Sequence, residues 1–143
     1  MKKICALCLT IAILSTIATL AYAAEPEKNV VDLGDGFYMV ETITQYSIHR
    51  ANDTVSANKT GSVFHGSSLV GTATLTAIFD ISGSDARAIR ATVEGTGYKG
   101  GTYVRGVGSC SGNTAFGTAY FKFDGIDKRL SLSIACSSDG TLS

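Results

Sequence analysis

Hydrophobic and polar positions alternate with a period of two along most of the chain beyond residue 28. In residues 69–80 every second position is apolar or small, and the positions between them include three threonines. Such alternation, with many Thr and β-branched residues, is typical of a strand that buries one of its faces. The same pattern predicts further strands in residues 37–48, 88–94, 102–109, 115–124 and 129–137.

Short segments rich in Gly, Ser and Asp separate these strands and are suited to hairpin turns. No segment of a dozen residues has a helical stripe. About seven or eight antiparallel strands in one domain predict an all-β fold. We expect a small antiparallel β-barrel, with a two-sheet β-sandwich as the alternative. Small inward residues, which are Gly71, Ala73, Gly117 and Ala119, favour the tightly curved wall of a barrel.

The N-terminus has the organisation of a secretory signal peptide. Lys2 and Lys3 precede an apolar stretch over residues 4–20, and residues 21–23 form a small-x-small cleavage sequence. We therefore predict that residues 1–23 are removed and that residues 24–143 form one domain, periplasmic or secreted, in what we interpret as a bacterial protein. Hydroxyl residues within the stretch argue against an uncleaved anchor, so no membrane insertion is expected after cleavage.

Two of the four cysteines, Cys110 and Cys136, lie beyond this leader. In an oxidising compartment the default for such a pair is a disulfide. The strands that carry them flank the strand at 115–124, and alternate strands lie about 9.5 Å apart, farther than a disulfide spans. The predicted disulfide therefore requires the turn at 109–114 to fold across the end of the middle strand.

Composition and motifs exclude several classes of function. Without the leader the chain has two more acidic than basic residues, so no nucleic-acid partner is expected. The only histidines, His49 and His65, lie in different segments, and no metal site is expected. Residues 95–100 match a G-x-G-x-x-G fingerprint, but a strand pattern follows where dinucleotide binding requires a helix. We therefore expect no cofactor.

The candidate binding site is a patch of cations and phenols. If strands 87–94, 102–107 and 115–124 are neighbours, five such residues share the face away from the core: Arg90, Tyr103, Arg105, Tyr120 and Lys122. Together they can bind an anionic or sugar-like partner through charge-assisted hydrogen bonds and stacking. A solvated face stabilised by cross-strand pairs is the other interpretation. Residues 51–60 are interpreted as a polar loop that joins two strands and borders the site.

No catalytic residue is assigned, because the chain has no nucleophile motif such as G-x-S-x-G. We expect an exported, non-catalytic protein that binds a small ligand, a glycan or a protein partner. Two alternatives stay open. One is a structural or adhesive subunit that assembles through sheet edges. The other is a small exported hydrolase or isomerase that uses a pocket inside the barrel.

Overall fold

The computed structural model of the protein describes residues 28–49 and 51–143, and in these residues it contains eight strands and no helix. The strands are β1 (Asn29–Gly34), β2 (Phe37–His49), β3 (Thr54–His65), β4 (Ser68–Asp80), β5 (Arg87–Gly97), β6 (Gly101–Ser111), β7 (Thr114–Phe123) and β8 (Ile126–Ala135). The predicted signal peptide, residues 1–23, lies outside the described residues.

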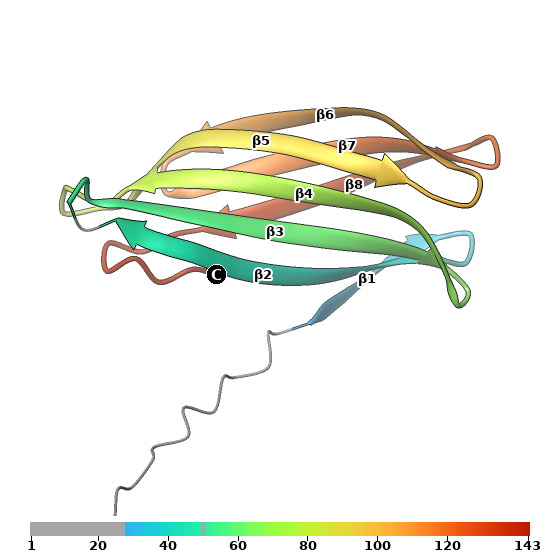
Figure 1. The fold of residues 1–143 in the computed structure, drawn as a ribbon, viewed down its shortest axis with the longest axis horizontal. Coiled ribbons are helices and arrows are strands. Elements are labelled where there is room, and N and C mark those ends of the chain that lie inside the picture. Colours follow the sequence, from blue (N-terminus) through green and yellow to red (C-terminus); the bar gives the residue numbers. More distant parts are fainter. Residues whose placement is uncertain (1–27, 50) are drawn as a thin grey trace, which may run out of the picture.

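The strands follow one another as an antiparallel meander that is divided into two sheets. One sheet has five strands in the order β1-β2-β3-β4-β5, and the other has three in the order β6-β7-β8. Figure 1 shows the three-stranded sheet, in orange and red, lying behind the five-stranded one. The all-β prediction is confirmed. The expected closed barrel is wrong, because β5 forms no ladder with β6 and the meander is split at that point.

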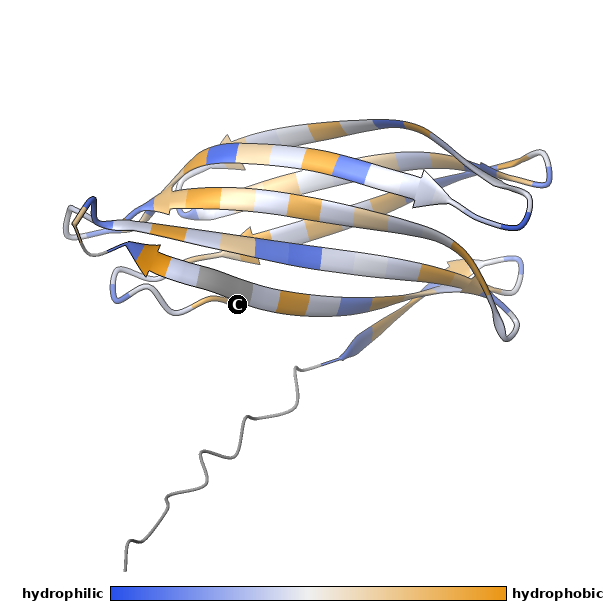
Figure 2. Ribbon diagram, viewed as in Figure 1, coloured by the Kyte–Doolittle hydropathy of each residue, from blue (hydrophilic) through white to orange (hydrophobic). Residues whose placement is uncertain are grey.

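The core lies between the two sheets, where each contributes its inward face. Apolar and polar residues alternate along the strands, as Figure 2 shows. The largest fully buried side chains come from both sheets and include Phe79 and Leu75 of β4, Phe121 and Phe123 of β7, and Leu130 of β8. Burial of side chains of this size contributes about 1.5–3 kcal/mol each to folding. The period-two pattern therefore sets the core face of each strand.

A row of aromatic rings joins the two sheets at one end of the core. The ring of Phe37 on β2 stacks on His65 at 4.3 Å and on Phe123 at 5.3 Å between centroids. Phe123 stacks on Phe121 at 5.3 Å, and Tyr103 meets Phe121 edge-on at 5.4 Å. Each such pair adds about 0.5–1.5 kcal/mol beyond the area it buries.

Glycines allow β6 to lie backbone against backbone on β5. A Cβ atom on Gly108 would lie 2.1 Å from the carbonyl oxygen of Ala91, and one on Gly106 would lie 2.6 Å from that of Val93. Only a residue without a Cβ fits so close an approach. The Tyr103 hydroxyl donates to the Val93 carbonyl oxygen at 3.1 Å. The Val93 carbonyl oxygen is therefore hydrogen-bonded to a side chain of β6 and not to its backbone. Between β5 and β6 the chain passes from one sheet to the other, and no ladder joins the two strands.

We predict that Gly108→Ala destabilises the fold by about 2–3 kcal/mol or more, because the new methyl group overlaps a backbone oxygen that cannot rotate away. Urea unfolding of the mature protein measures the effect. Gly83→Ala is the matched control. Its Cβ would meet nothing closer than 3.7 Å, so its free energy of unfolding should stay within about 0.5 kcal/mol of the wild type. Equal effects of the two substitutions would contradict the close contact at the corner.

The small inward residues are placed as predicted, but they do not curve a barrel wall. Ala73 and Ala119 are fully buried. A Cβ on Gly71 would lie 3.0 Å from Cε1 of Phe121, and one on Gly117 would lie 2.7 Å from Cγ2 of Val93. These positions instead make room for side chains of the facing sheet.

On the side of the molecule where β1 and β8 are the outermost strands, no ladder joins the two sheets. Lys128 of β8 links the two sheets at one end of this open side. Its ammonium group donates to the carbonyl oxygens of Leu33, at 2.8 Å, and Gly34, at 3.2 Å. It also pairs with Asp35 at 2.7 Å. The hydrogen bond from Lys128, followed by its charge, lowers the pKa of Asp35 below its ordinary value of 3.8. The β1–β2 turn is therefore fastened to β8 through one side chain.

The predicted disulfide is also wrong in this structure, since Cys110 and Cys136 are both free. Cys110 pairs with Ala115 on β7, and Ala115 pairs with Ile134 on β8, so that β7 lies between the two cysteines. The β6–β7 turn is tight, with a positive φ at Gly112, and it does not fold across the end of β7. Cysteines on alternate strands, about 9.5 Å apart, are too distant to bond.

We predict that the two thiols differ in reactivity in the native protein. Cys110 is exposed, whereas Cys136 is buried and burial raises the pKa of its thiol. Brief treatment with iodoacetamide, followed by peptide mass spectrometry, should label Cys110 alone, and prior unfolding should expose both. Cys110→Ser should abolish native labelling. Recovery of a peptide that joins Cys110 to Cys136 would contradict the structure.

The sequence pattern predicts neither β1 nor β3 at its observed place. The polar segment 51–60 was interpreted as a loop, but only its first residues form a turn and β3 begins at Thr54. Val55 and Ala57 are buried on its inner face. Lys59 also faces inward, where it pairs with Glu41. Because the charged Lys59 stands at an inward position, the alternation of apolar and polar residues along β3 is interrupted in the sequence, and the strand is not recognised.

Candidate functional site

Three polar side chains form a row across the outer face of the three-stranded sheet. Arg105 of β6 lies opposite Tyr120 of β7, and Tyr120 lies opposite Arg129 of β8. Side chains at directly opposite positions share a face, with their Cβ atoms about 5 Å apart. The Cζ atom of Arg105 is 4.5 Å from the centre of the Tyr120 ring, a cation–π contact. We call these three residues the Arg–Tyr–Arg row.

Lys122 lies on the same face, two residues along β7 from Tyr120. Its ammonium group is 3.5 Å from the Asp127 carboxylate, and both side chains are largely exposed. Exposed pairs of this kind contribute about 0–1 kcal/mol. Three of the five predicted site residues, Arg105, Tyr120 and Lys122, are therefore brought together by β6 and β7.

Tyr103 and Arg90 do not belong to this face. A bulge between Tyr103 and Arg105 shifts the register, so that Tyr103 pairs with Phe121 while Arg105 pairs with Tyr120. Because adjacent residues of β7 point to opposite faces, Tyr103 points inward although it is two residues from Arg105. Arg90 is opposite Ile78 on β4, in the other sheet. The predicted five-residue patch assumed a continuous sheet, and the corner at β5 and β6 divides it.

Arg129 was missed by the sequence reasoning, although a signal for it was present. Leu130 is fully buried, and Arg129 precedes it in the alternating segment 129–137, so its side chain had to face outward. What the sequence lacked was the register, which brings Arg129 opposite Tyr120.

A groove of about 360 Å³ accompanies the row and is lined by its three members together with Val104, Phe121, Asp127 and Lys128. Val104 is the bulged residue and is 57% exposed. Arg105 and Arg129 have no ion-pair partner among the described residues. The groove thus presents two guanidinium groups without an ion-pair partner, one of them against the Tyr120 ring. The Asp127 carboxylate, the Lys128 ammonium group and a small apolar surface lie beside them.

A second cleft opens on the inner side of β2, beside the C-terminal segment. The carboxylate of Glu41 accepts a hydrogen bond from Asn29 at 3.1 Å and pairs with Lys59 at 3.0 Å. Lys59 also donates to the Ser133 carbonyl oxygen at 3.1 Å, which links the two sheets. Only 6% of Glu41 is exposed. This cleft, of about 440 Å³, also includes Ile43, Leu142 and Ser143.

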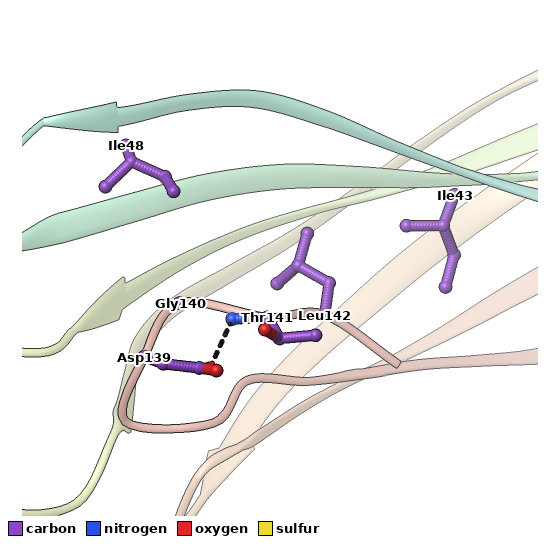
Figure 3. Close-up of a pocket in the computed structure, with 6 residues that line it drawn as sticks. All are labelled: Ile43, Ile48, Asp139, Gly140, Thr141 and Leu142. Carbon is purple, nitrogen blue, oxygen red and sulfur yellow. Dashed lines mark hydrogen bonds between the residues drawn. The ribbon is translucent and has the colours of Figure 1, made fainter. Parts of the chain in front are cut away.

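A cavity of about 350 Å³ between β2 and the C-terminal segment shares Ile43 and Leu142 with this cleft. In Figure 3, Leu142 points toward the space between Ile43 and Ile48 of β2. The segment is held as a short hairpin, in which Asp139 accepts from the Thr141 amide at 2.9 Å. Hydrogen bonds from Ser137 and Thr141 lower the pKa of Asp139 to about 2.

Among the residues that the structure describes, no group of three or more His, Cys, Asp or Glu side chains could hold a metal ion. His65 stacks on Phe37, and His49 lies 2.7 Å from the Ser47 hydroxyl. Residues 28–49 and 51–143 also contain no helix of the length and hydropathy that crossing a membrane requires.

Comparisons of the chain with protein-family models, with curated proteins and with solved structures find no match.

We predict that Lys59→Met destabilises the protein by about 3 kcal/mol, because it leaves the Glu41 carboxylate without its cation in a buried place. Lys122→Met makes the same change at the exposed pair with Asp127 and should cost less than about 1 kcal/mol. Thermal and urea unfolding of both variants provide the comparison. If Lys59→Met lowers the free energy of unfolding as little as Lys122→Met does, Lys59 does not stabilise the inter-sheet contact.

Proposed function

We propose that the protein is an exported, non-catalytic binding protein that recognises an acidic glycan through the Arg–Tyr–Arg row. The observation that carries this proposal is the register of Arg105, Tyr120 and Arg129 across three neighbouring strands. Export is inferred from the leader-like N-terminus.

The chemistry of the row suits this class of ligand. A guanidinium group binds carboxylate or sulfate oxygens through two parallel hydrogen bonds, and the aromatic face of a tyrosine offers a surface for stacking. Arg105 and Arg129 lie on alternate strands, about 9.5 Å apart at the backbone. A ligand with two acidic groups can therefore engage both arginines across Tyr120, whose ring already contacts Arg105.

The rigidity of the support favours binding over an adventitious cluster of charges. All three residues are held on hydrogen-bonded antiparallel strands, although β6 has a bulge just before Arg105. The inward residues next to them, Ala119, Phe121 and Leu130, are fully buried. The contact between Arg105 and Tyr120 orients one guanidinium group before any ligand arrives. Preorganised groups of this kind lose less conformational entropy on binding.

Binding of sulfated and carboxylated polysaccharides to the mature protein tests the proposal, with a neutral polysaccharide as the reference ligand. Arg105→Ala and Arg129→Ala should each weaken binding about 10- to 100-fold, the value of a charge-assisted hydrogen-bond pair. Tyr120→Ala should also weaken it, and added salt should reduce it. Arg90→Ala is the matched control, because Arg90 lies on the other sheet.

Two results would contradict the proposal. One is an absence of binding to every acidic polysaccharide. The other is an equal loss of binding in Arg90→Ala and Arg129→Ala, which would indicate general charge attraction in place of a site on the three-stranded sheet.

A further inference from the structure

The edge of the five-stranded sheet is only half covered. The β1–β2 ladder extends no farther along β2 than the pair Asn29 and Glu41, whereas β2 continues to His49. Residues 42–49 therefore have no strand beside them on that side among the residues that the structure describes. The C-terminal hairpin lies nearby, but its backbone hydrogen bonds go to Ala135, Asn113 and its own residues.

This open edge lacks most of the features that prevent strand pairing. Proteins usually protect an edge with charged residues, proline, a very short strand or a bulge. Residues 42–48 contain no charged residue, no proline and no glycine. β2 does carry a bulge between Gln45 and Ser47. The bulge also brings Ile43 and Ile48 to the same face of β2. Ile43 lies opposite Lys59, and Lys59 lies opposite buried Leu75. Ile48 lies opposite buried Val55, so both isoleucines are on the inner face.

We propose that two copies of this chain pair through residues 42–49 of β2, antiparallel and about a two-fold axis. With the axis between Gln45 and Tyr46, the bulges of the two strands lie opposite each other at the centre. Inward-facing residues of one copy then lie opposite inward-facing residues of the other, on both sides of the axis. The resulting cross-strand pairs between the copies are Thr42 with His49, Ile43 with Ile48, and Thr44 with Ser47.

The cavity beside β2 supports a second copy of the chain as the partner of this edge. Ile43, Ile48 and Leu142 line it (Figure 3). Of these, Ile48 is 43% exposed. In the paired arrangement, Ile48 of the second copy covers Ile43, and Ile43 of the second copy covers Ile48. The same register thus satisfies the open backbone edge and buries the apolar residues next to it.

The pairing joins two five-stranded sheets into one continuous sheet of ten strands. It leaves the Arg–Tyr–Arg row of each copy free, because that row belongs to the other sheet. A dimer of this kind presents two binding rows, and two linked sites bind a repeating polymer more tightly than one. The pairing itself does not depend on the proposed glycan binding and is tested without any ligand.

Sedimentation velocity of the mature protein, residues 24–143, tests the pairing up to about 1 mM, where even a dimer of millimolar affinity is well populated. We expect a monomer–dimer equilibrium. Hydrogen exchange at two protein concentrations locates the interface, and amides in residues 42–49 should become protected as the concentration rises. This second measurement needs no variant.

Ile48→Lys should weaken dimerisation about 100-fold or more, because each of the two symmetric contacts would place a charge against Ile43. Ile89→Lys is the matched control, since Ile89 on β5 is 54% exposed and lies far along the sheet from β2. Circular dichroism verifies that both variants are folded.

Three results would overturn the proposal. The first is a monomer at every concentration. The second is a dimer whose concentration-dependent protection lies outside residues 42–49. The third is protection of residues 42–49 that is independent of concentration in a sample that sediments as a monomer, which would show that another part of the same chain covers this edge.

Discussion

The contact between β5 and β6 is the constraint on which the rest of the structure depends. Gly106 and Gly108 bring the two backbones together where any side chain would overlap the carbonyl oxygens of Val93 and Ala91. Because the backbones stack at this corner instead of forming a ladder, the last three strands fold back as a separate layer, and the aromatic rings of β7 meet the inner face of the first sheet.

This corner leaves the opposite side of the molecule open, and polar contacts hold that side together. Lys128 fastens the β1–β2 turn to β8, and Lys59 links β3 to the Ser133 carbonyl oxygen. Both lysines have a carboxylate partner, Asp35 and Glu41 respectively. Ion pairs at an opening of this kind keep the layers in register while leaving the inner side of β2 accessible, which is where the clefts occur.

The two proposed surfaces follow from the same division. The three-stranded sheet presents the Arg–Tyr–Arg row on its outer face, and the five-stranded sheet leaves residues 42–49 of β2 without a neighbouring strand. In a closed barrel, neither the free edge nor the inter-sheet cleft would exist. The corner therefore separates one surface suited to a ligand from another suited to a second copy of the chain.

The sequence by itself determined that the protein is all-β, where six of the eight strands lie, and which residues of most strands face inward, because period-two alternation and turn residues are local properties. It also placed Arg105, Tyr120 and Lys122 on one outer face. Only the tertiary structure decided the split into two sheets, the distance between Cys110 and Cys136, the inward turn of Tyr103 and the place of Arg129 beside Tyr120. Those features depend on bulges, on register and on the close approach of the β6 glycines to the β5 backbone, and no local pattern of residues encodes them.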